Sequence, residues 1–155
     1  MKRLFFALVV ACSIAVSEPS AAGEPDFSGE WKMNPAKSAY GPVPMPTSFV
    51  RRILQQGDDI SIAEDQTGGG IDLVPIRRYI IDGEAVTFQI NGADVVGEVR
   101  REGVDLRVTS KVSMAGLEFQ DRMSISTDGK ELTSRVRIVS DQGVVDMTIV
   151  FDRQR

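Results

Sequence analysis

Asp26-Phe27-Ser28-Gly29-Glu30-Trp31-Lys32-Met33-Asn34-Pro35 is the stretch that decides the fold, and it carries the only tryptophan of the chain. Every second residue from Phe27 to Met33 is apolar or glycine, and the residues between them are polar. This period of two is typical of a strand with one buried face. Asn34 and Pro35 then suit the cap and first position of a single helical turn over residues 34–38. We predict a first strand that closes a barrel.

Residues 1–22 have the composition of a secretory signal peptide. Two basic residues precede an apolar run, and small residues follow near Ala22, where signal peptidase would cut. The run is shorter than the roughly 20 residues that a membrane-spanning helix needs, and no later segment approaches that length. We therefore expect residues 23–155 to form one domain that is exported, either periplasmic or secreted.

The single cysteine offers an alternative for the N-terminus. Val9-Val10-Ala11-Cys12 loosely resembles a bacterial lipobox, in which the cysteine is lipidated and becomes the new first residue. Cys12 falls early in the apolar run, and the better cleavage site lies downstream. We interpret Cys12 as an apolar residue of the signal peptide, and a lipid anchor through Cys12 is the alternative.

The composition excludes several classes of function. Histidine is absent, which removes the commonest general base and zinc ligand and the usual serine and zinc hydrolase sites. Removal of residues 1–22 takes away Lys2, Arg3 and Glu18 and changes the net charge from −4 to −5, which argues against nucleic acid as a partner. The acidic turns lack the spacing of a calcium loop. We predict no metal, no cofactor and no catalytic residue.

After residue 46 the chain reads as strands separated by turns. With the first strand, 27–33, the expected strands are 47–56, 58–64, 74–81, 85–90, 93–101, 104–112, 117–126, 131–139 and 144–153. Glycine-containing turns that suit tight hairpins separate many of them: Asp82-Gly83, Asn91-Gly92, Glu102-Gly103, Asp128-Gly129 and Gln142-Gly143. We predict an all-β fold, a single up-and-down antiparallel β-barrel of about eight to ten strands. A Greek-key sandwich is the alternative.

Two segments depart from this regular pattern. Residues 41–46 hold three alternating prolines, which favour an extended strap across a surface or a barrel end. Gly68-Gly69-Gly70, followed by Pro75, predicts a loose loop and a gap between strands, because proline belongs at sheet edges and bulges.

The opening Phe27-Ser28-Gly29-Glu30-Trp31-Lys32-Met33 resembles the Phe-x-Gly-x-Trp-Lys start of fatty-acid-binding proteins, and its Gly-x-Trp is shared with lipocalins. The ending Thr148-Ile149-Val150-Phe151-Asp152-Arg153 is similar to their last strand. Followed by residues 34–38, the opening also resembles a group of uncharacterised exported bacterial proteins. The resemblance implies a lipocalin-like calycin barrel that holds a small apolar ligand.

The resemblance also implies a structural role for the opening strand. In lipocalins the tryptophan packs at the closed end of the barrel beside an arginine from near the C-terminus. Gly29, Trp31 and Arg153 are therefore expected to close the barrel. Two features of fatty-acid-binding proteins are missing: the proline strap replaces their two lid helices, and Ile149 and Phe151 stand where an Arg-x-Tyr pair would grip a carboxylate.

Charged residues within apolar alternation mark candidate interior positions. Neighbours on a strand point to opposite faces, so one arginine of each pair Arg51-Arg52, Arg77-Arg78 and Arg100-Arg101 is directed toward the interior or its rim. Such an arginine would anchor an anionic ligand. We favour the other interpretation, solvated strand ends that discourage edge pairing.

Asp121 shares an apolar face with Phe119 and Met123, and a buried carboxylate needs a partner. We hypothesise that Asp121 meets Arg78 inside the barrel and forms the polar end of a ligand site. The alternative is that this face turns outward, or that a bulge shifts the register.

The leading functional prediction is an exported, non-catalytic carrier of a small apolar or amphipathic molecule. Bulky side chains on apolar faces give the lining candidates, which with Arg78 and Asp121 are Phe49, Tyr79, Phe88, Phe119, Met123 and Met147. The alternative is an envelope protein-interaction module with a packed barrel. A cavity of about 300 Å³ or more would favour the carrier. A third class, an enzyme built on Asp and Arg, would leave no motif.

Overall fold

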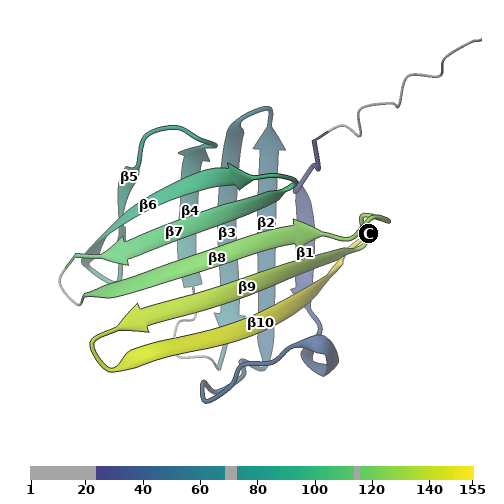
Figure 1. Ribbon diagram of the computed structural model, residues 1–155. Coiled ribbons are helices and arrows are strands. Elements are labelled where there is room, and N and C mark those ends of the chain that lie inside the picture. The colour runs from purple at the N-terminus through teal and green to yellow at the C-terminus, as the bar shows by residue number, and fades with distance from the viewer. Residues whose placement is uncertain (1–23, 69–72, 114–115) are drawn as a thin grey trace, which may run out of the picture.

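The computed structural model describes residues 24–68, 73–113 and 116–155. Ten strands form one antiparallel sheet in the order β4-β3-β2-β1-β10-β9-β8-β7-β6-β5, curled into a nearly closed barrel (Figure 1). The strands are β1 (Gly29–Met33), β2 (Ser48–Gln56), β3 (Asp59–Thr67), β4 (Leu73–Ile80), β5 (Val86–Ile90), β6 (Ala93–Glu102), β7 (Asp105–Val112), β8 (Leu117–Ile125), β9 (Glu131–Ser140) and β10 (Gly143–Arg153).

This arrangement confirms the predicted all-β up-and-down barrel and excludes the Greek-key sandwich. Paired strands are neighbours along the chain, except where β1 joins β10. In the part of the chain that the structure describes, no helix is long and apolar enough to span a membrane. The predicted signal peptide, residues 1–22, and Cys12 lie outside the described residues, as do Gly69 and Gly70 of the predicted loop.

The seam of the barrel lies between β4 and β5, because the described residues form no ladder between these two strands. The prediction that Asp82-Gly83 makes a hairpin between neighbouring paired strands is therefore wrong. The turn instead docks on β6, where the Asp82 N–H donates to the carbonyl of Val99 at 2.8 Å. Asp82 itself adopts a positive φ of 60°, and a side chain at Gly83 would collide with Ile80, its Cβ only 2.7 Å from that of Ile80.

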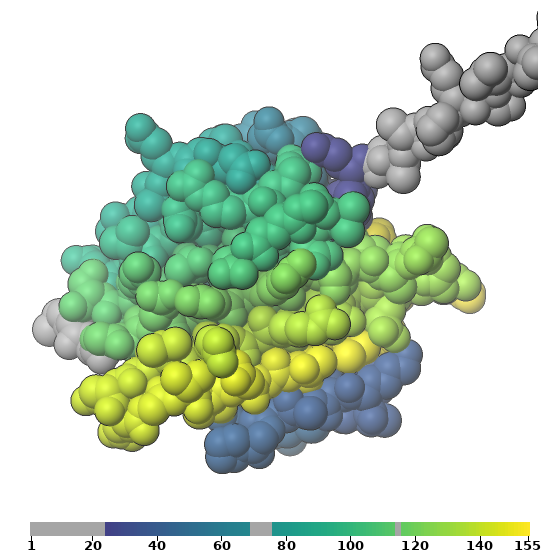
Figure 2. Space-filling view, in the orientation of Figure 1, coloured from purple at the N-terminus to yellow at the C-terminus, as the bar shows by residue number. Residues whose placement is uncertain are grey.

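The segment after β1 runs across one end of the barrel. It begins with the 3₁₀ turn η1 (Pro35–Lys37), which confirms the predicted helical turn, but the Asn34 side chain does not cap it. That amide donates to Asp152 Oδ2 at 2.8 Å instead. From here on, the strap means residues 39–46, which include the three prolines of residues 41–46. It starts with two backbone hydrogen bonds of 2.7 and 2.9 Å between Ala39 and Thr148 of β10. Figure 2 shows this segment lying along β10.

The apolar core fills the barrel end opposite the strap. Alternation within each strand sends one set of side chains inward, and the largest fully buried ones include Phe27, Trp31, Leu106, Met123 and Phe151. The Trp31 indole N–H donates to the carbonyl of Phe27 at 3.0 Å, so its one polar group is satisfied. This end is closed, and any space for a ligand lies toward the strap.

Candidate functional site

A cavity of about 340 Å³ lies inside the barrel, between its middle and the strap. Most of its wall is apolar, and the strap contributes Tyr40, Val43, Pro44 and Pro46. Inward-pointing polar side chains interrupt the apolar wall at Arg51, Glu64, Gln66, Arg77, Ser110 and Asp121. The interior therefore combines an apolar chamber with a small polar region.

The polar region is built by ordinary strand alternation. Arg51 lies between Phe49 and Ile53 on the inward face of β2, and Asp121 lies between Phe119 and Met123 on the inward face of β8. Three strands separate β2 from β8 in the sheet, so the two residues approach one another across the barrel interior. Arg51 also pairs in register with Trp31, which places it next to the closed end.

Arg51 is the centre of a buried ion cluster, which we define as Arg51, Glu64, Arg77, Asp121 and Ser134. Its Nη2 lies 2.6 Å from Glu64 Oε1 and 2.9 Å from Asp121 Oδ2. Its Nε donates to Glu64 Oε1 at 2.8 Å, and its Nη1 donates to Ser134 Oγ at 2.6 Å. Arg77 Nη2 reaches the second Glu64 oxygen at 2.7 Å. Two guanidiniums thus face two carboxylates, and their formal charges balance.

Aromatic rings complete the environment of Arg51. The guanidinium carbon lies 5.0 Å from the ring centroid of Phe151 and 5.6 Å from that of Phe49, within the range of cation–π contacts. These two rings pack edge to face, with their centroids 5.0 Å apart. Arg51 is therefore held in one position by ions, a hydroxyl and two rings, which suits a fixed structural centre better than a mobile side chain.

Burial and charge together set the protonation of the cluster. Burial opposes the ionisation of Glu64, but the Arg77 and Arg51 guanidiniums outweigh it and lower the pKa of Glu64 below its ordinary value. Burial raises the pKa of Asp121, because the attraction of Arg51 and the Ser134 hydrogen bond do not offset it. Burial also disfavours the charged form of Arg51, but Asp121 and Glu64 outweigh it and raise its pKa. Asp121 is the carboxylate of the cluster that accepts a proton more readily than usual.

The predicted partnership of Asp121 with Arg78 is wrong, because Asp121 pairs with Arg51 and Arg78 is exposed on the outer face of β4. The inward arginine of that pair is Arg77. A register shift between β3 and β4 lies next to this site, between Ile62 and Glu64. Ile76 shares the outward face of Arg78 and is 64% exposed, so an apolar residue there does not mark the interior.

Five of the predicted lining residues lie on the cavity wall, and three do not. Those on the wall are Phe49, Phe119, Asp121, Met123 and Met147. Besides Arg78, Tyr79 and Phe88 fall outside it. Their rings pack edge to face, with centroids 6.2 Å apart, against the backbone of Gly97, where a Cβ would lie 2.8 Å from Phe88 and 3.0 Å from Tyr79. The absence of a side chain at Gly97 thus leaves the space that the two aromatic rings occupy.

Several cavity residues were not among the predicted candidates. Glu64 follows Ile60 and Ile62 at a period of two, so the argument that selected Asp121 applied to it as well. Arg51 was named only as one member of an arginine pair. Tyr40 belongs to the strap, whose inward side no strand pattern reveals, and burial raises the pKa of its phenol to about 12.

The opening strand has a structural role at the closed end of the barrel. The Arg153 guanidinium lies over the Trp31 ring, with its carbon 4.2 Å from the ring centroid. Its Nε donates to the carbonyl of Gly129 and its Nη1 to that of Ser28, both at 2.8 Å. Gly29 has a φ of 144°, and a Cβ there would stand 3.2 Å from Arg153 Nη1. Gly29 therefore leaves space for Arg153, which links the last strand to the segment before the first strand.

The acidic side chains of the site are dispersed or paired. Among residues 24–68, 73–113 and 116–155, no three His, Cys, Asp or Glu side chains come together as metal ligands would. The two carboxylates of the cluster are both committed to arginines.

No protein-family model and no curated protein sequence matches this chain. Solved structures do. A secretory abundant heat soluble protein from Ramazzottius varieornatus has a TM-score of 0.64 and 12% identity over 83% of this chain and 95% of its own. The zebrafish ileal bile-acid-binding protein has a TM-score of 0.60 and 20% identity, over 83% and 98%. Fatty-acid-binding protein 1 from Echinococcus granulosus has a TM-score of 0.61 and 14% identity, over 83% and 98%.

These similarities establish the fold. The chain has the same antiparallel β-barrel fold as these structures, as the resemblance of its opening strand implies. Identities of 12–20% carry no further than the architecture.

Proposed function

We propose that this protein is a non-catalytic binding protein that holds one small apolar or amphipathic molecule inside its barrel. The observation that carries the proposal is the largely apolar cavity of about 340 Å³ around a buried polar cluster. Small-molecule sites typically enclose roughly 300–1,000 Å³ and combine apolar walls with a few oriented polar groups. A barrel that served only as a protein-interaction module would be expected to fill this space with side chains, so the cavity favours the carrier.

Two of the structurally similar proteins support this proposal through the molecules associated with them. The zebrafish protein is a bile-acid-binding protein in complex with cholic acid, and the Echinococcus granulosus protein is a fatty-acid-binding protein. Both names describe carriers of amphipathic molecules. The support is by analogy of fold, since function depends on the site rather than on the architecture.

The cluster further indicates a ligand whose polar group is uncharged. Arg51 and Arg77 are both engaged by carboxylates, so a ligand anion would have to compete with Glu64 and Asp121 for them. In the described part of the chain, Arg77 Nε and Asp121 Oδ1 are buried and have no hydrogen-bond partner. They leave one donor and one acceptor at the polar end of the cavity, which suits a hydroxyl or carbonyl group.

We propose further that the carrier acts outside the cytoplasm of a bacterial cell, with the signal peptide of residues 1–22 directing export. The support is the sequence itself, in which basic, apolar and small residues follow one another in the order that signal peptidase substrates show.

A dye titration tests the binding proposal. Nile red, an uncharged fluorophore, is titrated into the wild-type protein and into two variants, in each of which one alanine is replaced by tryptophan. Ala93 lines the cavity, whereas Ala85 is exposed outside it. Ala93→Trp should abolish saturable binding by filling the chamber, and Ala85→Trp should bind as the wild type does. Equal binding by both variants, with unchanged circular dichroism, would show that the cavity is not the site.

A further inference from the structure

The outer face of the barrel carries a row of arginines in register across consecutive strands. Each stands directly opposite the next: Arg100 of β6, Arg107 of β7, Arg122 of β8 and Arg135 of β9. The same row continues through Thr148 of β10 to Ala39 of the strap. Because neighbouring strands lie about 4.8 Å apart, the four arginine Cα atoms fall within roughly 15 Å of one another.

Such a row costs stability, since like charges directly opposite one another on a sheet repel. Ion pairs with carboxylates reduce this repulsion for three of the arginines. The pairs are Arg100–Glu98, Arg107–Glu102 and Arg122–Asp105, each with an N–O distance of 2.8 Å. Arg135 is different. It is exposed and forms no ion pair with any residue in the ranges 24–68, 73–113 and 116–155. Among the described residues, the row therefore ends in an arginine that has no ion-pair partner.

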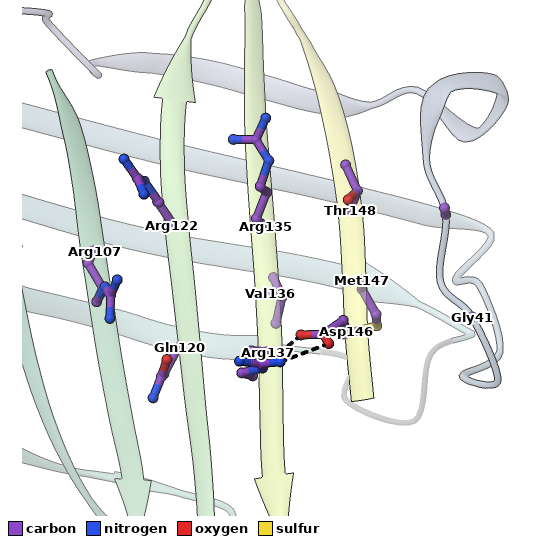
Figure 3. A pocket seen from close by; sticks show the side chains of 11 residues that line it. Gly41, Arg107, Gln120, Arg122, Arg135, Val136, Arg137, Asp146, Met147 and Thr148 are labelled. Atoms are coloured by element: carbon purple, nitrogen blue, oxygen red, sulfur yellow. Dashed lines mark hydrogen bonds and ion pairs between the residues drawn. The ribbon is translucent and has the colours of Figure 1, made fainter. Parts of the chain in front are cut away.

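The space beside Arg135 is hollow. The next two members of the row, Thr148 and Ala39, are small, and a groove of about 520 Å³ opens there between β7–β10 and the strap. Figure 3 shows the arginine side chains of β7, β8 and β9 along this groove, with the strap residue Gly41 across from them. Besides Thr148, the polar and charged side chains that line it are Arg107, Gln120, Arg122, Arg135, Arg137 and Asp146.

The charge of the groove is opposite to that of the whole chain. Its lining holds four arginines, of which Arg137 is bound to Asp146 through contacts of 2.9 and 3.2 Å. Arg107 and Arg122 are paired with Glu102 and Asp105, so the excess positive charge among the described residues is that of Arg135. The chain as a whole carries a formal charge of −4. A local basic hollow on an acidic protein concentrates the positive potential at one place on the surface.

We propose that this groove is a second binding site, separate from the barrel cavity, for a small solute that carries two or more phosphate groups. Guanidinium groups bind phosphate oxygens bidentately through charge-assisted hydrogen bonds, and a phosphate group brings about −1.5 to −2 charges. A compact multiply charged anion engages Arg135 directly. It competes with Asp105 for Arg122 and with Glu102 for Arg107, which its higher charge allows. The hollow shape fits a solute that enters it, whereas a bilayer surface would meet only its rim.

Isothermal titration calorimetry with inorganic tripolyphosphate tests this site on the full-length protein. The wild type should bind with one-to-one stoichiometry. Arg135→Gln should weaken binding about tenfold or more, as expected for the loss of one charge-assisted hydrogen bond. Ala39→Leu, which narrows the groove without changing its charge, should also weaken binding. Arg52→Gln, on β2 and paired with Glu30, is the matched charge control and should bind as the wild type does.

Three results would overturn the proposal. The first is the absence of saturable tripolyphosphate binding by the wild type. The second is an equal loss in Arg52→Gln and Arg135→Gln, which would show a general charge effect. The third is binding to phosphatidylglycerol vesicles without tripolyphosphate binding, which would identify a membrane surface as the partner. Because Arg135 is exposed, its variant should keep the wild-type circular dichroism.

Discussion

The guanidinium of Arg51 joins opposite walls of the barrel: its Nη2 lies 2.9 Å from Asp121 Oδ2, although three strands lie between β2 and β8 in the sheet. The same nitrogen lies 2.6 Å from Glu64. Breaking a buried pair by removing one partner is costly, because the other charge stays buried without compensation. Arg51 therefore links opposite walls of the barrel and forms the polar centre of its cavity.

A double-mutant cycle should measure the coupling free energy between Arg51 and Asp121. Arg51→Met should lower the free energy of unfolding by about 3–5 kcal/mol, because Asp121 then has no cation. Adding Asp121→Leu should restore at least about 1 kcal/mol, since neighbouring sites that share a charge are not additive. Urea denaturation followed by circular dichroism measures both values. Strictly additive losses would contradict the pairing.

The pH dependence of stability should separate the two carboxylates. The raised pKa of Asp121 means that the folded state binds its proton more tightly than the unfolded chain does, so its contribution is fully present below about pH 3.9 and is lost as the pH rises through the folded pKa. The melting temperature of wild type minus that of Asp121→Asn should therefore fall as the pH is raised above about 3.9.

Glu64 should behave in the opposite way, because its folded pKa is lowered. Its contribution is present above the unfolded pKa of about 4.3 and is lost as the pH falls through the folded pKa. The melting temperature of wild type minus that of Glu64→Gln should rise as the pH is raised from about 3 to about 5. The same slope for both carboxylates would contradict the assignment.

The architecture was readable from the sequence because its signals are local. Alternation identified all ten strands, and the Gly-x-Trp opening indicated the calycin barrel. The errors are non-local. Arg78 was chosen over Arg77 although Tyr79, two residues after Arg77, was expected inside. Ile76 and Ile80 share the face of Arg78 and are exposed, so apolar residues on β4 do not distinguish its two faces. The hairpin expected at Asp82-Gly83 became the seam, because a turn signal does not say which strands pair.

Contacts across the barrel were the hardest to predict. Asp121 was selected correctly as a charged residue on an inward face, but its partner is fixed by strand order and barrel diameter, which no local pattern encodes. The arginine row on the outer face has the same origin. Its members are scattered through residues 100–135 and come into line only through the register of four strands.

The closed end should depend strongly on the tryptophan. Trp31 is fully buried and lies under Arg153, so Trp31→Ala should cost about 3–5 kcal/mol, as large aromatic truncations in a core do. The loss should be equal in the presence and absence of ligand. Thermal unfolding followed by circular dichroism gives the value, and an unchanged melting temperature would refute the structural role.

The N-terminus of the mature protein should begin at residue 23. Intact mass spectrometry of the protein expressed in a bacterial host with its full N-terminal segment measures this directly. A mass that corresponds to residues 23–155 supports signal peptidase cleavage after Ala22. A chain that starts at a diacylated Cys12 would instead show a lipid-anchored protein.

The central claim, that the barrel is a carrier, is tested most directly by native mass spectrometry of the protein after mild purification from its source cell. We expect a wild-type species that carries one additional small molecule, released on denaturation, and its absence from Ala93→Trp, which fills the cavity. The released molecule should be apolar with an uncharged polar group. The control variant Ala85→Trp, whose substitution lies outside the cavity, is prepared in the same way. If the wild type and this control both show only the mass of the polypeptide, the result would contradict the carrier function.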